Sequence, residues 1–352
     1  MKQENHNKKG KSAWIVLLII LAILLVIGGG IFWFLNSKLN LIQFDDGSRE
    51  IDTSASCEVN NDELEIGDLP NGPAGAQADG DKLEILHDDD VFNVLLLGTD
   101  ERTNQFSDNA RADSIMVLSL NTKQHTIKLV SIERGIGVPV PGRNDDWLTH
   151  TFRYGGAKLT MDTVRELFRV DVDRYVRVNF NVFETGINAI GGVDLNLTEA
   201  EATYLRDANM YNGKHPNISK QIHPGVCHLD GDLALQYGRL REIDSDWKRI
   251  ERQRKVIQAA LNQVKGLGIG ELNDLVNTIL PMVQTNLTKG EIAKLAMEIP
   301  GFVAGGAQIE DMTVPAEGTA WNSVGVDGRK MIGVDFNANA KILRELFYGV
   351  TE

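Results

Sequence analysis

The stretch VFNVLLLGTD, residues 91–100, is a short apolar run rich in Val and Leu that ends at a Gly-Thr-Asp turn. A run of this length bounded by turn residues predicts a buried β-strand. Two further apolar stretches, SIMVLSLN at 114–121 and TIKLVSIE at 126–133, are separated by a polar turn region. They predict a hairpin or two neighbouring strands, so this part of the chain is expected to form the centre of a sheet.

Segments with helical spacing follow these strands. LTMDTVRELFRV at 159–170 predicts a helix with one apolar side, and residues 174–197 predict a strand, a helix and a strand. KRIERQRKVIQAALNQVKGLG at 248–268 predicts a long helix ended by glycines, and ANAKILRELFYG at 338–349 predicts a last helix. The expected fold class is therefore α/β, a mixed central β-sheet flanked by helices.

Composition limits the class of partner. The chain has 352 residues, 42% of them hydrophobic and 24% charged, with a formal net charge of -13. Such an acidic chain lacks the basic footprint of nucleic-acid binding, and an anionic ligand would need a local arginine cluster. Residues 91–352 show no internal repeat or second linker, so they are expected to form one catalytic domain.

The N-terminal part predicts a membrane anchor. AWIVLLIILAILLVIGGGIFWFL, residues 13–35, carries no charge and is long enough to cross a bilayer as a transmembrane helix. Lysines precede it in residues 1–12 and acidic residues follow it, so the positive-inside rule predicts a cytoplasmic tail and an extracytoplasmic domain. This is a single-pass signal-anchor topology in a cell membrane.

Residues 36–90 are acidic and rich in turn residues, which predicts an extracytoplasmic stalk or a loosely packed extension. The chain has two cysteines, Cys57 and Cys227, and both lie on the oxidising side in this topology. They form either a disulfide between stalk and domain or two free thiols.

Arginine and aspartate gather where the apolar strands end. Three such places are GTDER, with Asp100 and Arg102, ARADS, with Arg111 and Asp113, and SIERG, with Arg134. Strand ends are where α/β folds place their sites. A fourth cluster spans YGRLREIDSDWKRIERQRK, residues 237–255, with Arg239 and Arg241 at its start.

Within that fourth cluster, helical spacing places Asp246, Arg249 and Gln253 on one face, beside the apolar Ile250 and Ile257. Charges that continue an apolar face are costly unless they are paired or bind a ligand. This face therefore forms either a salt-bridge network or the lining of a site.

The residue types favour a phosphate ligand. Arginine presents a planar fork of donors that matches phosphate oxygens, and several arginines suit a diphosphate. Aspartates among them indicate an intervening cation, for which Mg²⁺ is the usual choice. The alternative is a structural Arg-Asp lattice without a ligand. His150 is either a base or a hydrogen-bonded structural residue, and His223, Cys227 and His228 lack the fourth ligand of a zinc site.

The motifs, in their order, resemble the LytR-CpsA-Psr family of Gram-positive cell-wall proteins from about Val91 to Leu261. The resemblance is carried by LLLGTDER, RADSIMVLSL, LVSIERG, FRYGGAKLTMDTVREL, INAIGGVDLNL, LDGDLALQYGRLR and DWKRIERQRKVI. It implies a glycopolymer phosphotransferase that moves teichoic acid or capsular polysaccharide from an undecaprenyl pyrophosphate carrier to a peptidoglycan hydroxyl. Membrane attachment is also typical of the family.

The resemblance also implies roles for individual residues. The metal carboxylates correspond to Asp100 and Asp113, and the helix-borne site residues to Asp246, Arg249 and Gln253. The pyrophosphate clamp corresponds to Arg111, Arg134, Arg239 and Arg241, with Arg249 and Gln253 beside it. Asp100, Arg102, Arg134 and Asp246 are the expected catalytic residues. The prenyl chain is expected in an apolar tunnel lined in part by Leu167, Phe168, Val256 and Ile257.

One departure from the family pattern concerns the third motif. The usual Ser-Ile-Pro-Arg-Asp reads here Ser-Ile-Glu-Arg-Gly, so Gly135 stands in place of an aspartate and Glu133 in place of a proline. The general base is therefore left open. Two alternatives follow: a non-catalytic module that binds polyprenyl phosphates or regulates the envelope, and a hydrolase that releases the polymer to water.

Overall fold

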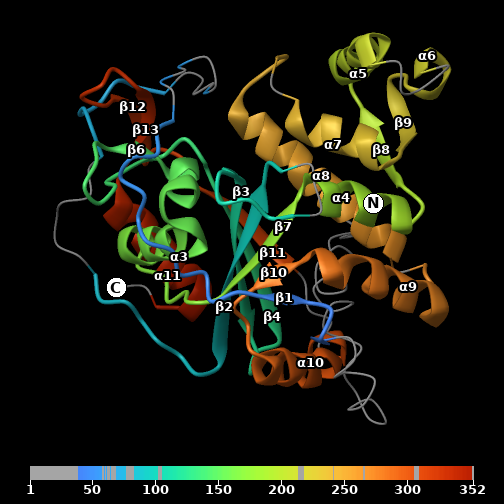
Figure 1. Ribbon diagram of the computed structural model, residues 1–352, viewed down its shortest axis with the longest axis horizontal. Helices are drawn as coiled ribbons and strands as arrows, with labels where there is room; N and C mark the ends of the chain where they lie inside the picture. The colour runs from blue at the N-terminus through green and yellow to red at the C-terminus, as the bar shows by residue number, and fades with distance from the viewer. Residues whose placement is uncertain are drawn as a thin grey trace, which may run out of the picture.

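The protein is described by a computed structural model. It covers residues 39–57, 59, 61, 64, 69–76, 83–101, 105–212, 218–240, 242–264, 266–304 and 309–350. A twisted β-sheet lies at the centre, and helices cover both of its faces (Figure 1). The predicted fold class, a mixed sheet flanked by helices, is confirmed for these residues.

The central sheet has seven strands in the order β1-β10-β7-β2-β3-β4-β11. Their bounds are β1 Gln43–Phe44, β2 Val91–Thr99, β3 Ala112–Asn121, β4 Thr126–Ile132, β7 Tyr175–Asn179, β10 Gln284–Thr285 and β11 Ile309–Val314. The pairs β2-β3, β3-β4 and β7-β10 are antiparallel, whereas β2-β7, β4-β11 and β1-β10 are parallel. The predicted hairpin is thus β3-β4, and the apolar run at 91–99 is the strand beside it.

The first face of the sheet carries a large apolar core. Helices α3 (Leu148–Phe168) and α11 (Phe336–Tyr348) pack there on β2, β3 and β4. Gly156 adopts φ 66° inside α3, a left-handed conformation that favours glycine, and the helix kinks at this point. Small strand pairs lie beside α3: β5 (Gly137–Val138) with β6 (Asp146–Trp147), and β12 (Ala320–Val324) with β13 (Lys330–Val334).

The second face is covered by α4 (Phe180–Ala189), α7 (Gly231–Arg239), α8 (Asp246–Val264) and α9 (Ile269–Ile279). Capping side chains start two of these helices, since Asn179 Oδ1 accepts from Val182 N and Asp230 Oδ1 from Leu233 N, both at 3.0 Å. The remaining elements are β8 (Val193–Leu197), α5 (Glu199–Asn212), α6 (Ile218–Gln221), β9 (Gly225–Leu229), η3 (Leu280–Met282) and α10 (Lys289–Ala304).

Several of the described residues between 39 and 90 pack on the domain. β1 extends the sheet by pairing with β10, and Leu64 is buried in the core of the first face. Asn71 forms a β-bridge with Asn322. A few buried side chains and backbone pairing thus hold the described part of this acidic, turn-rich segment to the domain.

The predicted cytoplasmic tail at 1–12 and transmembrane helix at 13–35 lie outside the described residues. None of the helices described has the length and apolar character needed to span a bilayer. Cys57 and Cys227 are both free thiols. Each packs with a different apolar cluster, Cys57 on the first face of the sheet and Cys227 on the second.

Candidate active site

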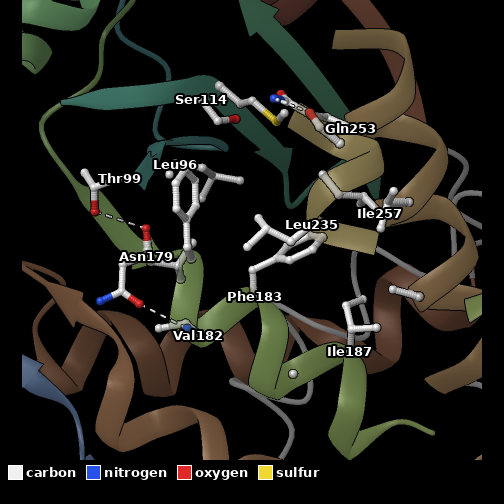
Figure 2. A pocket seen from close by; sticks show the side chains of 18 of the residues that line it. Leu96, Thr99, Ser114, Asn179, Val182, Phe183, Ile187, Leu235, Gln253 and Ile257 are labelled. Carbon is white, nitrogen blue, oxygen red and sulfur yellow. Dashed lines mark hydrogen bonds between the residues drawn. The ribbon is translucent and has the colours of Figure 1, made fainter. Parts of the chain in front are cut away.

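A cavity of about 320 Å³ lies between the second face of the sheet and the helices α4, α7, α8 and α9 (Figure 2). Its wall is mostly apolar because β2, β3 and β7 turn alternate side chains toward it, and each helix contributes its buried stripe. The apolar lining includes Leu96, Met116, Val176, Phe183, Ile187, Leu235, Val256, Ile257, Ala260 and Val276. A cavity of this kind accommodates an apolar chain.

Polar side chains interrupt this apolar lining. They come from strand ends and from α7 and α8: Thr99, Asp113, Ser114, Asn179, Arg239, Arg249 and Gln253. The cavity therefore combines an apolar wall with donors suited to an anionic group, which is the arrangement a lipid with a phosphorylated head requires.

A β-bulge brings Asp113 into this set. Thr99 pairs with Ala112 and Gly98 pairs with Ser114, so Asp113 is the extra residue between two consecutive pairs. In a regular strand, neighbouring side chains point to opposite faces, yet both Asp113 and Ser114 line the cavity. A bulge redirects a side chain in this way and is common beside active sites.

Asp113 lies between two buried arginines. Arg134 Nη1 donates to Asp113 Oδ1 at 3.1 Å, and Arg249 Nη1 donates to the Asp113 carbonyl oxygen at 3.3 Å. Arg134 is 2% exposed and Arg249 is 3% exposed. Arg249 lines the cavity, whereas Arg134 supports Asp113 from behind the lining.

Asp100 and Arg111 form a neighbouring pair. Asp100 Oδ1 accepts from Arg111 N at 3.0 Å, and Asp100 Oδ2 lies 3.4 Å from Arg111 Nε. Both side chains are partly exposed and neither lines the cavity. Asp100 directly follows β2 and Arg111 directly precedes β3. The Thr99–Ala112 pair therefore separates them from Asp113.

The helices hold two more of the expected site residues. The Arg239 guanidinium lies over the Phe180 ring at 4.6 Å, and Gln253 Nε2 donates to the Gly238 carbonyl oxygen at 3.2 Å. Gln253 thereby ties α8 to the end of α7, next to Arg239. The sequence-based prediction did not include Phe180, although it directly follows the strand RYVRVN, and a strand end was the signal used elsewhere.

Some expected site residues are not placed. Arg102 and Arg241 lie outside the described residues. Asp246 is the first residue of α8, but its side chain is also outside the description. The structure thus brings Asp113, Arg134, Arg239, Arg249 and Gln253 together, with Asp100 and Arg111 adjacent.

The prediction of the apolar tunnel lining is confirmed for two of its four residues and wrong for the other two. Val256 and Ile257 line the cavity, but Leu167 and Phe168 belong to the core on the opposite face of the sheet. Helical periodicity identified the buried side of residues 159–170. It did not reveal which face of the sheet the helix covers.

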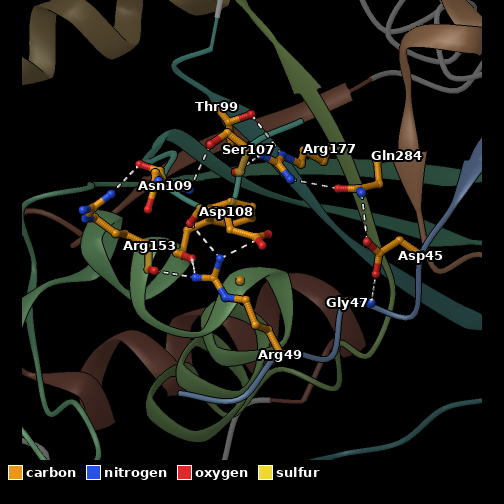
Figure 3. A network of polar contacts seen from close by, with 12 residues as sticks. Asp45, Gly47, Arg49, Thr99, Ser107, Asp108, Asn109, Arg153, Arg177 and Gln284 are labelled. Carbon is orange, nitrogen blue, oxygen red and sulfur yellow. Dashed lines mark hydrogen bonds and ion pairs between the residues drawn. The ribbon is translucent and has the colours of Figure 1, made fainter. Parts of the chain in front are cut away.

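A polar network fixes the loop that follows β2 (Figure 3). Arg177, on β7, forms an ion pair with Glu101 and donates to Ser107 O at 2.9 Å and to Gln284 Oε1 at 2.9 Å. Burial lowers the pKa of the Arg177 guanidinium, and the neighbouring Glu101 carboxylate opposes this shift. Since Glu101 directly follows Asp100, this network holds the Asp100 end of the site in place.

Arg49 extends this network to the N-terminal segment. It donates to Asp108 O at 2.7 Å and to Phe152 O at 3.0 Å, and its Nη1 lies 3.3 Å from Asp108 Oδ1. Figure 3 shows Arg49 reaching from the N-terminal segment to the loop of Asp108 and to α3 near Arg153. The residues before β2 thus help to position the site loop.

The departure at Gly135 has a structural counterpart. A Cβ at this position would lie 2.1 Å from Leu64 Cδ1, so Leu64 occupies the space of the missing side chain. Glu133 is fully buried, does not line the cavity, and its Oε1 accepts from Gly135 N at 3.3 Å. Glu133 therefore stabilises the turn and does not replace an aspartate at the cavity.

With this geometry in place, the chain can be compared with known proteins. The model of the LytR_cpsA_psr family matches residues 67–347. The chain belongs to this family. The match begins inside the segment predicted as a stalk, in agreement with the packing of that segment on the domain.

Curated members of the family are similar over much of the chain. A protein from Oceanobacillus iheyensis, named polyisoprenyl-teichoic acid--peptidoglycan teichoic acid transferase TagU, is 29% identical over 92% of this chain and 91% of its own length. The corresponding transferase TagT of Bacillus subtilis is 36% identical over 56% of this chain and 61% of its own length.

Solved structures of family members share the fold. TagT bound to LIIa-WTA has a TM-score of 0.57 and 26% identity, covering 78% of this chain and 97% of that chain. The crystal structure of Bacillus subtilis TagT has a TM-score of 0.56 and 26% identity, covering 80% of this chain and 99% of that chain. The family resemblance seen in the sequence motifs is therefore confirmed.

Proposed function

We propose that this member of the family is a Mg²⁺-dependent phosphotransferase that attaches a teichoic acid or related glycopolymer to peptidoglycan from a polyprenyl pyrophosphate carrier. The observation that carries the proposal is the cavity, whose apolar wall meets Arg239, Arg249 and the bulged Asp113. The wall suits the prenyl chain and the polar lining suits its pyrophosphate.

The transfer needs one bond to form and one to break. The acceptor hydroxyl attacks the phosphorus that carries the polymer, the bond to the bridging oxygen breaks, and the polyprenyl phosphate leaves and takes up the proton of the hydroxyl. Arg239 and Arg249 would bind the phosphate oxygens, and Arg134 holds the Asp113 carboxylate in position. Because negative charge accumulates on the departing phosphate, cations held in place lower the barrier.

The donor chemistry fits Mg²⁺. Asp100 and Asp113 stand on adjacent strand ends, and Mg²⁺ is commonly held by one or two carboxylates together with phosphate oxygens. Within the residues that the structure describes, no three His, Cys, Asp or Glu side chains gather as a metal site. The substrate's phosphate oxygens would therefore complete the coordination. The ion would supply neutralisation of the phosphate charge.

A transfer assay tests the proposal. Purified protein is mixed with a polyprenyl pyrophosphate-linked glycopolymer, peptidoglycan oligomers and Mg²⁺, and the phosphodiester product is measured by mass spectrometry. Arg249→Gln is expected to reduce transfer at least about 100-fold, because it removes a cation from the cavity. Arg254→Gln is the matched control. It lies on the same helix but pairs with Asp311 at 3.0 Å, away from the cavity.

The products distinguish the alternatives. A hydrolase would release the polymer in water without a peptidoglycan adduct. A binding module would retain the lipid without turnover, and Leu64 in the place of an aspartate side chain at position 135 is the observation that favours this second candidate. Absence of any adduct with or without Mg²⁺ would rule out the transferase.

The membrane anchor remains part of the proposal. If residues 13–35 span the bilayer, residues 36–38 alone separate the span from the buried Leu39. Extended chain covers about 3.5 Å per residue, so Leu39 would lie within about 15 Å of the span's end. The domain would then lie close to the extracytoplasmic surface of the cell membrane, with the exposed Leu41 and Phe44 near that surface.

Fractionation tests this location. The full chain is expected in the membrane fraction, with its domain accessible to protease from outside, and a chain lacking residues 1–38 is expected in the soluble fraction. Recovery of the full chain in the soluble fraction would disprove the anchor while leaving the transfer assay unaffected.

A further inference from the structure

A buried arginine on α8 holds the connection between α7 and α8. Arg252 is 2% exposed and does not line the cavity. Its guanidinium donates twice to Asp244, from Nη1 to Oδ2 at 2.7 Å and from Nη2 to Oδ1 at 2.6 Å. Nη2 also donates to the Leu240 carbonyl oxygen at 2.7 Å. Leu240 and Asp244 both lie between α7 and α8, so one side chain fixes the connection at two points.

The geometry of these bonds makes the contact specific for arginine. The planar guanidinium fork meets both oxygens of the Asp244 carboxylate at once, and a lysine ammonium cannot reproduce this arrangement. A charge as deeply buried as that of Arg252 is costly unless it is paired. The connection is therefore held in one position relative to α8.

A second carboxylate anchors Arg252 from the side of α5. Glu201 Oε1 lies 3.5 Å from Arg252 Nη1, and Glu201 Oε2 accepts from Thr198 N at 2.8 Å at the start of α5. Glu201 is itself 5% exposed. The guanidinium thus rests on a buried carboxylate, and its shorter bonds are those to the connection.

Arg239, which lines the cavity, lies between two backbone groups that α8 holds. Gln253 Nε2 donates to the Gly238 carbonyl oxygen at 3.2 Å, and Arg252 Nη2 donates to the Leu240 carbonyl oxygen. These are the residues directly before and after Arg239. Two consecutive side chains of α8 therefore fix the backbone of Arg239 on both sides. Figure 1 shows α7 and α8 next to each other, as this contact requires.

Arg249 lies on the same helix as Arg252, one turn earlier, and also lines the cavity. Because Arg252 joins α8 to the residue after Arg239, it sets where Arg239 stands relative to Arg249. A pyrophosphate needs its donors at fixed places, since a small displacement of a charged donor weakens the interaction strongly.

We propose that Arg252 is a positioning residue that gives the cavity its preference for a pyrophosphorylated lipid over the corresponding alcohol. It acts through Arg239 and Arg249 and contacts no lipid itself. This inference rests on the proposed function, because it assumes that these two arginines bind the phosphate oxygens.

The test measures binding of geranylgeranyl pyrophosphate and of geranylgeraniol to the full chain in detergent by calorimetric titration. The ratio of the two affinities is the pyrophosphate preference. Arg252→Lys is expected to weaken binding of the pyrophosphate at least about tenfold, because the two arginines lose their fixed spacing. Binding of the alcohol should change less than about twofold, since the apolar wall is untouched.

Arg254→Lys is the matched control. It is the same substitution on the same helix, at an arginine that pairs with Asp311 at 3.0 Å away from the cavity. Both affinities should stay as in the wild type. Equal weakening of the two lipids in Arg252→Lys would indicate a general loosening of α8 and would overturn the proposal.

Asp244→Asn tests the same contact from the connection. It removes the charge that the guanidinium fork binds, at a position that is only partly buried, and should lower the pyrophosphate preference at least about threefold. This variant decides the question if Arg252→Lys does not fold. An unchanged preference in either folded variant would overturn the proposal.

The wild-type protein separates this inference from the proposed function. A wild type without any pyrophosphate preference would overturn the proposed lipid specificity and this inference with it. A wild-type preference that survives both substitutions would overturn the role of Arg252 alone and leave the proposed function standing.

Discussion

A Cβ atom on residue 135 would lie only 2.1 Å from Leu64 Cδ1, so Leu64 occupies the space that any residue larger than glycine would need there. The N-terminal segment and the turn after β4 are therefore fitted to each other. Glycine at position 135 makes room for the buried Leu64 side chain. Substituting either residue tests this packing.

Gly135→Ala is expected to lower the free energy of unfolding by about 1–3 kcal/mol, because the added methyl group overpacks this contact. Leu64→Ala alone should cost about 2–5 kcal/mol by leaving a cavity. The double variant should be more stable than the sum of the two losses predicts, since the short side chain at 64 makes room for alanine at 135. Denaturant unfolding of the four proteins measures this coupling, and strict additivity would contradict it.

Ile257→Trp is expected to fill the cavity and to weaken binding of a polyprenyl phosphate at least about tenfold, because Ile257 contributes to the apolar wall. Fluorescence titration with the lipid in detergent measures the affinity. Gln258→Trp is the control, since this neighbour on α8 is exposed and does not line the cavity. Equal affinities of the two variants would place the lipid elsewhere.

Asp113→Asn is expected to raise the Mg²⁺ concentration needed for half-maximal transfer at least about tenfold, because it removes a carboxylate next to the phosphate-binding arginines. It should also destabilise the fold, since it removes the negative charge that pairs with the buried Arg134 at 3.1 Å. Asp311→Asn, at a half-exposed ion pair with Arg254, should change neither quantity noticeably. An unchanged Mg²⁺ requirement in Asp113→Asn would remove this residue from the metal site.

The Asp146–His150 pair is expected to make stability depend on pH. Burial disfavours the charged form of His150, but the hydrogen bond between its Nδ1 and Asp146 Oδ1 at 2.8 Å contributes to a net rise of its pKa. The contribution of His150 is therefore complete below about pH 6.5 and is lost as the pH rises through the folded-state value. Burial would raise the pKa of Asp146, but its hydrogen bonds with His150 and Tyr154 and the nearby charge of Arg329 lower it. The contribution of Asp146 is therefore complete above about pH 4 and is lost as the pH falls through its folded-state value.

Stability added by this pair should therefore be greatest between about pH 4 and about pH 6.5. Chemical unfolding of the Cys57→Ser protein with and without His150→Gln measures it, because the serine removes the titration of the thiol. A stability difference that grows steadily above pH 7 would have the wrong sign.

The sequence predicted the centre of this fold well. Strong apolar runs and helical periodicity located β2, the β3-β4 hairpin and α8, and the helix face of Arg249 and Gln253 does line the cavity. These features depend on local pattern, which determines the buried side of an element directly.

Other features depend on contacts that local pattern does not contain. The bulge at Asp113 arises from a pairing mismatch between two strands, and the position of Leu167 on the far face arises from the path of the whole chain. The packing of the described residues between 39 and 76 depends on a few side chains such as Leu64 within a polar segment. Composition predicted a stalk there because most of its residues are indeed polar.

The pairing of β1 with β10 has a consequence for biosynthesis. Gln284 Nε2 donates to Asp45 Oδ2, and these residues are 239 positions apart. During synthesis, β1 can pair with β10 only after residues 284–285 have been made, and pairings between such distant residues form slowly. Until then the edge of β7 is exposed, so the newly made domain is expected to be most vulnerable to aggregation and proteolysis just before residues 284–285 emerge.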